Sequence, residues 1–322
     1  MKPSARGTTA ALCLYAVLAS VSAWAADTLV LVSDLNGRYG ATDYSPRVSA
    51  AVEAITALEP MAVISAGDMV AGQKQPELGP DRLDQMWRSF TRVFIEPLER
   101  AGIPLAVTPG NHDASAFPAF ELERRHYEEH WRGRGGALDI LPGSEWPWRY
   151  GAGLSGTLLL SFDGTRPGRL PNSERVFLER MLERFAPEFE TVIVFSHLPL
   201  WPIASGRERE LIDDPDLLTL LHRHDVDAYV SGHHHAFYAG RDDRGMLHVA
   251  LGALGGNSRH YSDGASRQPH SFTVMEIEDT GIRVSTRVAP GFTDPIDPES
   301  LPIRIDGPLG RLTRLEASAF RP

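Results

Sequence analysis

The chain has almost no cysteine: one residue in 322, Cys13. Cys13 falls in a segment that we expect to be removed, so the mature protein is predicted to contain no disulfide, no thiolate ligand and no cysteine nucleophile. A chain without disulfides depends on its hydrophobic core for stability. With 42% hydrophobic residues, this chain is able to form one large core or two small ones.

An excess of basic residues is also missing. The 32 Lys and Arg residues are outnumbered by 42 Asp and Glu residues, which gives a formal net charge of -10 and a pI near 5.6. This balance argues against nucleic acid or an anionic membrane as a partner, because both require a basic surface. If the substrate is an anion, local cations must attract it, and bound metal ions would supply them.

The first residues have the pattern of a signal peptide. Lys2 and Arg6 precede an apolar run, and a small-x-small triplet ends at Ala25. We therefore expect residues 1–25 to be cleaved and the mature chain, starting at Ala26, to be periplasmic or secreted. The alternative is an uncleaved membrane anchor, but the apolar run is short for a bilayer core of roughly 30 Å. No stable membrane insertion is expected after cleavage.

Strand-like and helix-like segments then alternate along the chain. Residues 28–33 form a continuous apolar run, typical of a strand buried on both faces. Ser45 and Pro46 predict a helix start, and a second buried strand at 61–65 completes a βαβ unit. By the same criteria we expect strands at 105–107, 157–162, 191–195, 228–230, 246–250, 272–277 and 282–288, and helices at 83–98, 120–131, 171–185 and 217–221.

We assign residues 26–288 to one domain. Within it, residues 114–150 have the features of an insertion, and their aromatic cluster at 146–150 suits either a lid over a site or local packing. Both interpretations stay open on the sequence. Residues 289–322 are proline-rich and have few apolar anchors, so we expect a C-terminal tail that either wraps the surface or is loose.

Potential metal ligands follow five of the predicted strands. In extended backbone the side chains at i and i+2 point the same way, so His233 and His235 face one point while His234 faces away. The other four strands end at Asp34, Asp68, Asn111 and His197. Sites in α/β sheets lie beyond the carboxyl ends of the strands. Oxygen and imidazole ligands without thiolate suit Zn²⁺, Mn²⁺ or Fe.

In this pattern the chain resembles the calcineurin-like metallophosphoesterase family. The matching motifs are Asp34-Leu35-Asn36, Gly67-Asp68, Gly110-Asn111-His112-Asp113, His197 and Gly232-His233-His234-His235, within residues 28–250. The resemblance implies an α/β fold, a four-layer α/β/β/α sandwich of two mixed sheets, with two metal ions (Mn, Zn or Fe) at the sheet edge. It also implies that Asp68 bridges the metals, that Asp34 and His235 bind the first, and that Asn111, His197 and His233 bind the second.

The resemblance further implies hydrolysis of phosphate mono- or diesters, the activity of a phosphatase or phosphodiesterase. Two cations lower the pKa of a bound water, and the resulting hydroxide attacks phosphorus in line. His112 would protonate the leaving group as a general acid, and Asp113 would orient its imidazole. The expected partner is a small phosphoester.

One residue departs from the family pattern. The family usually has histidine at the third position of the first motif, where this chain has Asn36. An amide oxygen is a weaker ligand than imidazole, and Ala71 occupies the position of the tyrosine that purple acid phosphatases use, so we expect a weak first metal site. Asn36 and Arg38 are candidates for a weak metal or substrate contact. Two other functions stay open: a metal-binding periplasmic protein without hydrolytic activity, and a pyrophosphohydrolase acting on nucleotide-linked substrates.

Overall fold

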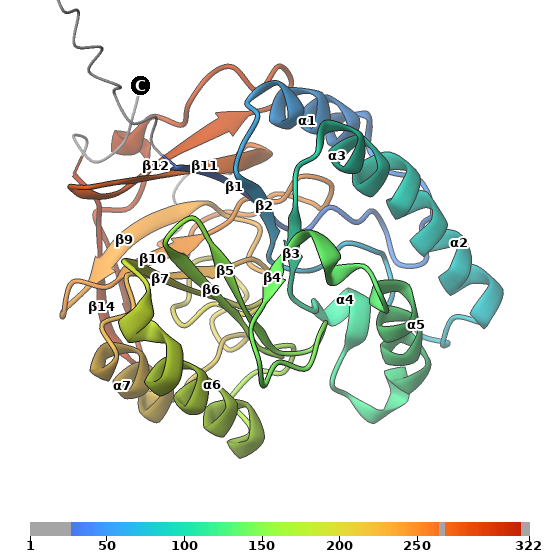
Figure 1. Cartoon of the computed structure of the whole chain (residues 1–322). Helices are drawn as coiled ribbons and strands as arrows, with labels where there is room; N and C mark the ends of the chain where they lie inside the picture. The colour runs from blue at the N-terminus through green and yellow to red at the C-terminus, as the bar shows by residue number, and fades with distance from the viewer. Residues whose placement is uncertain (1–26, 264–267, 317–322) are drawn as a thin grey trace, which may run out of the picture.

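Two mixed β-sheets pack face to face, with helices on their outer sides (Figure 1). The structure is a computed structural model that describes residues 27–263 and 268–316. The predicted signal peptide, residues 1–25, lies outside the described residues. No helix in the described part of the chain is long and apolar enough to cross a membrane.

The first sheet has the strand order β12-β11-β1-β2-β3. Strands β1 to β3 are parallel, as the βαβ pattern near the start of the chain predicts, and β11 and β12 add an antiparallel hairpin. The strands are β1 Asp27–Val32, β2 Ala62–Ser65, β3 Leu105–Val107, β11 Ser271–Glu278 and β12 Gly281–Val288.

The second sheet has the order β13-β14-β9-β10-β8-β7-β6-β5-β4. Its centre, β10-β8-β7-β6, is parallel, and antiparallel strands lie on both sides of that centre. The strands are β4 Asp139–Ile140, β5 Tyr150–Leu154, β6 Thr157–Ser161, β7 Thr191–Phe195, β8 Ala228–Ser231, β9 Tyr238–Asp242, β10 Leu247–Ala250, β13 Arg304–Gly307 and β14 Gly310–Arg314.

Helices cover the outer face of each sheet. In Figure 1, α1, α2 and α3 lie beside the first sheet, and α6 and α7 lie beside the second. The α-helices are α1 Pro46–Ala57, α2 Pro80–Phe90, α3 Glu96–Ala101, α4 Asn111–Ala114, α5 Glu121–Trp131, α6 Asn172–Phe185 and α7 Pro215–Arg223. A π-helical turn covers Thr91–Ile95, and short 3₁₀ turns cover Pro118–Phe120, Gly135–Ala137, Ala186–Glu188 and Pro298–Ser300.

The side chains of β1 alternate between two hydrophobic cores. Leu29 and Leu31 belong to the core that contains the second sheet, whereas Val30 and Val32 belong to the core beneath α1 to α3. Successive side chains of a strand point to opposite faces, so a strand buried on both faces is apolar throughout. The resulting layer order is helix, sheet, sheet, helix, which confirms the four-layer α/β/β/α sandwich.

The helix that we expected at 83–98 is divided. α2 ends at Phe90, the π-helical turn follows, and α3 begins at Glu96 with Pro97 in its first turn. Proline has no N–H to donate to the preceding turn, and its ring crowds the carbonyl four residues earlier. The wider π-helical turn leaves room for the proline ring, and α3 begins directly after that turn.

The inserted segment packs against α2. The His130 ring on α5 stacks on Trp87 with ring centroids 4.3 Å apart, and burial lowers the pKa of His130 to about 3. Trp146 donates a hydrogen bond of 2.9 Å to the carbonyl of Trp131, and the guanidinium of Arg124 lies over the ring of Trp148. Of the two interpretations of the cluster at 146–150, the structure therefore supports local packing.

Residues 304–314 differ from the loose tail that we considered for 289–322. They form the hairpin β13–β14, and β14 pairs with β9 at the edge of the second sheet. The side chains of Ile305 and Leu312 are buried. The sequence did not reveal this hairpin because its two apolar anchors are isolated among charged and polar residues.

Candidate metal centre and active site

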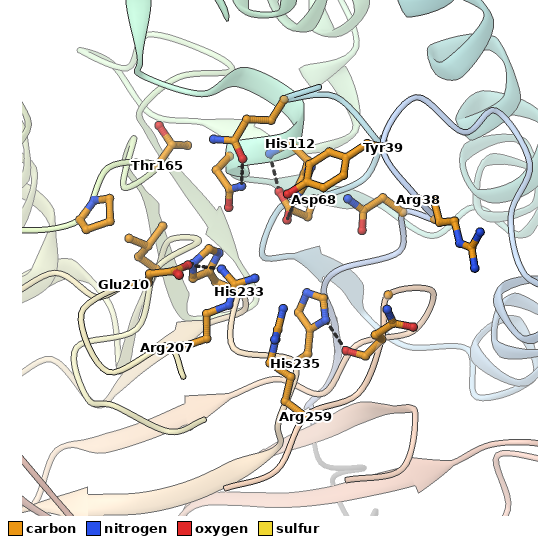
Figure 2. Close-up of a pocket in the computed structure, with 18 of the residues that line it drawn as sticks. Arg38, Tyr39, Asp68, His112, Thr165, Arg207, Glu210, His233, His235 and Arg259 are labelled. Carbon is orange, nitrogen blue, oxygen red and sulfur yellow. Dashed lines mark hydrogen bonds and ion pairs between the residues drawn. The ribbon is translucent and has the colours of Figure 1, made fainter. Parts of the chain in front are cut away.

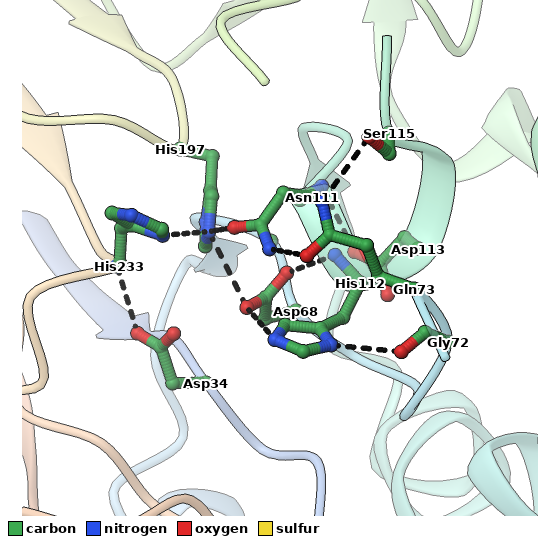
Figure 3. A network of polar contacts seen from close by, with 12 residues as sticks. Asp34, Asp68, Gly72, Gln73, Asn111, His112, Asp113, Ser115, His197 and His233 are labelled. Carbon is green, nitrogen blue, oxygen red and sulfur yellow. Dashed lines mark hydrogen bonds and ion pairs between the residues drawn. The ribbon is translucent and has the colours of Figure 1, made fainter. Parts of the chain in front are cut away.

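Six side chains predicted as ligands meet where the carboxyl ends of five strands face one another. Asp34, Asp68 and Asn111 follow β1, β2 and β3 of the first sheet, whereas His197, His233 and His235 follow β7 and β8 of the second. Figure 3 shows Asp34, Asp68, Asn111, His197 and His233 converging from these separate segments. The site thus belongs to the junction between the sheets, and neither sheet forms it alone.

The ligand atoms assigned to the second metal lie closest together. His197 Nε2 is 3.4 Å from Asp68 Oδ2, 2.9 Å from Asn111 Oδ1 and 3.2 Å from His233 Nδ1. Asp68, His197 and His233 each offer an atom within 4.8 Å of the others, and all three are buried. This spacing suits one divalent metal ion bound to a carboxylate and two imidazoles.

The residues assigned to the first metal form a looser group. Asp34 Oδ1 lies 3.0 Å from His235 Nε2, and Asp34 Oδ2 accepts the backbone N–H of His233 at 3.0 Å. Asn36 is buried and lines the same pocket. Asp34, His235 and Asp68 do not form a close group of the kind that Asp68, His197 and His233 form among the described residues.

In each histidine assigned as a ligand, the ring nitrogen that does not face the metal position has a hydrogen-bond partner in the protein. His197 Nδ1 faces the carbonyl of Ala66 at 2.7 Å, and His235 Nδ1 faces the carbonyl of Asn257 at 2.6 Å. A carbonyl only accepts, so these Nδ1 atoms carry protons and leave each Nε2 with a lone pair for a ligand. Partners of this kind fix the ring orientation and raise the basicity of a metal-binding histidine.

The donor set itself indicates a cation. The Asn111 amide donates through Nδ2 to Gln73 Oε1 at 2.7 Å, so its Oδ1, which only accepts, faces the Nε2 of His197. Two electron-rich atoms 2.9 Å apart require a proton or a metal ion between them. Burial opposes protonation of His197, but the carboxylate of Asp68 outweighs it and raises the pKa of His197 to about 9. A metal ion would displace that proton.

The two central carboxylates stay ionised in this environment. Burial opposes ionisation of Asp68, but the imidazoles of His197 and His112 outweigh it and hold its pKa below the ordinary value. Burial likewise opposes ionisation of Asp34, and His235 lowers its pKa. Burial lowers the pKa of His233 to about 4, so its imidazole is neutral, as a metal ligand must be.

The backbone is strained where the ligands leave their strands. Asp34, Asp68, His233 and His235 have φ values of 54°, 57°, 65° and 52°. Left-handed conformations are uncommon for residues with a Cβ and persist where the surrounding structure enforces them. A Cβ at Gly110 would overlap the backbone nitrogen and carboxylate of Asp68, so only glycine permits this close approach of the two loops.

The prediction that Asp113 orients the His112 imidazole is wrong. The carboxylate oxygens of Asp113 accept backbone N–H groups from Val70 at 2.8 Å and from Gly110 at 3.0 Å. His112 Nδ1 instead faces the carbonyl of Gly72 at 2.9 Å. Asp113 therefore holds two loops of the site together, because it lies one position beyond His112 on a helical turn and faces a different direction.

Three residues outside the sequence motifs hold the site. Glu210 Oε2 lies 2.9 Å from His233 Nε2 and so fixes the ring that offers Nδ1 to the metal. Gln73 fixes the Asn111 amide, and both carboxylate oxygens of Glu123 accept the Gln73 backbone N–H at 2.9 Å. No local pattern marks these residues, because each acts on a residue at least 23 positions away.

A pocket of about 550 Å³ opens over the ligand residues. Figure 2 shows His112 and Tyr39 on one side of it, and His233, His235, Arg207 and Arg259 on another. Arg38 and Asn36 also line it, and from the inserted segment Phe117 contributes to the wall. None of residues 146–150 lines this pocket.

We predict that Glu210→Ala weakens Zn²⁺ or Mn²⁺ binding by about 10- to 100-fold, because the His233 ring loses the partner that orients it. Glu208→Ala is the matched control, since Glu208 is exposed on the same loop. Competition with a metal-sensitive chelator measures both affinities, and thermal unfolding of the metal-free proteins tests whether both variants fold. Equal affinities in the two folded variants would contradict the role of Glu210.

Two solved structures with this fold are named phosphatases. A dimetal phosphatase from Danio rerio superposes with a TM-score of 0.56 at 15% identity, over 84% of this chain and 98% of that one. The purple acid phosphatase PPD1 from yellow lupin seeds gives 0.63 at 15% identity, over 84% of this chain and 52% of that one. The chain thus spans about half the length of the lupin enzyme.

A third structure with this fold is described as an anchor and not as an enzyme. GAP50, described as the anchor in the inner membrane complex of Plasmodium, gives a TM-score of 0.52 at 16% identity, over 92% of this chain and 91% of that one. At such identities these likenesses show a shared fold. No curated protein matches the chain in sequence. The sequence model of the calcineurin-like phosphoesterase family, however, matches residues 28–237, so the chain belongs to that family.

Proposed function

We propose that this protein hydrolyses phosphate mono- or diesters with two divalent metal ions at the sheet junction. The observation that carries the proposal is the cluster of acceptor atoms from Asp68, Asn111, His197 and His233, which suits a cation. Asp34 and His235 would hold the first ion, Asn111, His197 and His233 the second, and Asp68 both. When bound, such ions polarise a phosphoryl oxygen and lower the pKa of a bound water.

His112 is the proposed general acid for the leaving group. Its Nδ1 faces the Gly72 carbonyl, which leaves Nε2 directed toward the site, 3.8 Å from Asp68 Oδ2. The backbone N–H of His112 donates to Asp68 Oδ1 at 2.8 Å. This hydrogen bond orients the Asp68 carboxylate and also holds the His112 backbone beside it. The Tyr39 ring lies 4.9 Å from the His112 ring and is 56% exposed, which offers an apolar surface to a leaving group.

Membership of the family supports a phosphoesterase in general terms, and two of the solved structures with this fold are named phosphatases. Fold alone does not determine function, since GAP50 shares the fold and is described as an anchor. The fixed orientation of His112 favours hydrolysis over a binding role, because a binding protein needs no proton donor at that position. A pyrophosphohydrolase acting on nucleotide-linked substrates would use the same residues.

We predict that the protein with added Mn²⁺ hydrolyses 4-nitrophenyl phosphate or its diester. His112→Gln should lower kcat for an alkyl ester by about 10²- to 10⁴-fold. The loss should be smaller for the 4-nitrophenyl ester, because 4-nitrophenolate leaves without being protonated. Steady-state kinetics on both esters, at equal metal content, measure this difference. An equal loss for both leaving groups would exclude His112 as the general acid, and no turnover of any ester would exclude the hydrolase.

We predict unequal affinity of the two metal sites, because Asn36 replaces an imidazole and Asp34, His235 and Asp68 form the looser group. Gel filtration in chelator-free buffer, followed by elemental analysis, should leave about one equivalent of metal. Asn36→His should raise the retained metal toward two equivalents. Two full equivalents in the unmodified protein after dilution would refute a weak first site.

We also propose export, which the charged start, apolar run and small-x-small triplet of residues 1–25 support. The expected result is a periplasmic or secreted chain that begins at Ala26, as determined by N-terminal sequencing of the fractionated protein. A chain that keeps Met1 and sediments with membranes would instead indicate an anchor.

A further inference from the structure

Besides Arg38, which follows the first motif, two arginines line the pocket, Arg207 and Arg259. Each lies on a loop that is bonded directly to the histidine motif. In Figure 2 both side chains lie on the side of His233 and His235, and away from His112. They are close enough for the charge of Arg207 to act on Arg259. A chain with a net charge of -10 thus places two cations beside its candidate metal centre.

His234, the histidine that faces away from the metals, holds the loop of Arg207. Its Nδ1 accepts the backbone N–H of Ile203 at 3.1 Å, and its Nε2 donates to the carbonyl of Glu210 at 3.0 Å. The Glu210 side chain then binds His233, which fixes the loop relative to the metal ligands.

His235 holds the loop of Arg259 in the same way. Its Nδ1 donates to the carbonyl of Asn257 at 2.6 Å, and its own carbonyl accepts the backbone N–H of Arg259 at 3.4 Å. Gly256 packs so closely on the His235 ring that a Cβ would lie 2.6 Å from its Cε1. Both arginines therefore lie on loops that the histidine motif at 233–235 holds in place.

The two guanidinium groups differ in their partners. Arg207 forms an ion pair with Glu210. Arg259 is half-buried, has no carboxylate within 4.0 Å among the residues at 27–263 and 268–316, and its Nε is buried without a hydrogen-bond partner there. A buried N–H donor without a partner is costly. An anionic ligand that enters the pocket would satisfy it.

We propose that Arg259, assisted by Arg207, binds a second anionic group of the substrate, a phosphate or a carboxylate, in addition to the phosphoryl group that is hydrolysed. This inference rests on the proposed function and specifies its substrate class. The simpler alternative to a second anion subsite is that Arg259 binds the reacting phosphoryl group itself. In that case Arg259 would strengthen the binding of all phosphate esters equally, which binding measurements distinguish from a second subsite.

The test measures binding and needs no turnover. The Mn²⁺-loaded protein is titrated calorimetrically with three non-hydrolysable ligand series of two to six carbons: alkyl phosphonates, ω-carboxyalkyl phosphonates and α,ω-bisphosphonates. At one chain length or more, a second anionic group should tighten binding by about 10- to 100-fold over the alkyl phosphonate. The carboxylate and bisphosphonate series show which anion the subsite prefers.

Arg259→Gln should abolish the preference for a second anionic group over the alkyl phosphonate. For the bisphosphonates, which have two identical ends, a statistical factor of about two would remain. Arg259→Lys should retain part of the preference. Arg209→Gln is the matched control, because Arg209 carries the same charge on the loop of Arg207 but is exposed and does not line the pocket. Metal content and thermal unfolding of each variant test whether the site is intact.

Three outcomes would overturn the inference: no preference for a second anion, a preference that Arg259→Gln leaves unchanged, or an equal loss in Arg209→Gln. An equal weakening of all three series in Arg259→Gln would assign Arg259 to the reacting phosphoryl group. Failure of the 4-nitrophenyl esters to react would count against the proposed hydrolase. It would not decide whether Arg259 binds a second anion, because the binding measurement needs no turnover.

Discussion

The position of one buried carboxylate, Asp68, is the constraint on which the rest of the site depends. Its Oδ1 accepts the backbone N–H of His112, and its Oδ2 faces the Nε2 of His197 from the opposite sheet. Its carbonyl also accepts the backbone N–H groups of Leu35 and Asn36. Asp68, in the loop that follows β2, thereby connects three loops from two sheets. Such a position requires a left-handed backbone at Asp68 and a glycine at position 110.

Around this carboxylate, groups that only accept hydrogen bonds determine how the side chains of the site are oriented. The carbonyls of Ala66, Gly72 and Asn257 each fix one imidazole through its Nδ1. His233 is the exception: its Nε2 is fixed by the Glu210 carboxylate, and Nδ1 faces the centre. Fixed orientation matters because a metal site gains affinity when its ligands need not be ordered on binding.

The same histidine motif also controls the wall of the pocket. Each of its three rings has a second contact on a neighbouring loop: His233 with Glu210, His234 with Ile203 and Glu210, and His235 with Asn257. Three consecutive residues therefore couple the metal centre to the two loops that present arginines. A shift of the motif would move both the candidate ligands and the two arginine loops, because the same three residues contact both.

The resemblance to the family implied the layer architecture, whereas the sequence by itself determined the strands that carry the site and the residue types at their ends. These depend on local patterns, such as the apolar run at β1 and the glycine before Asp68. Only the tertiary structure decided which groups orient the ligands, that Asp113 holds loops instead of the His112 ring, and that residues 304–314 complete a sheet. Those features arise from contacts between segments distant in the chain, and a local pattern carries no information about the far partner of a hydrogen bond.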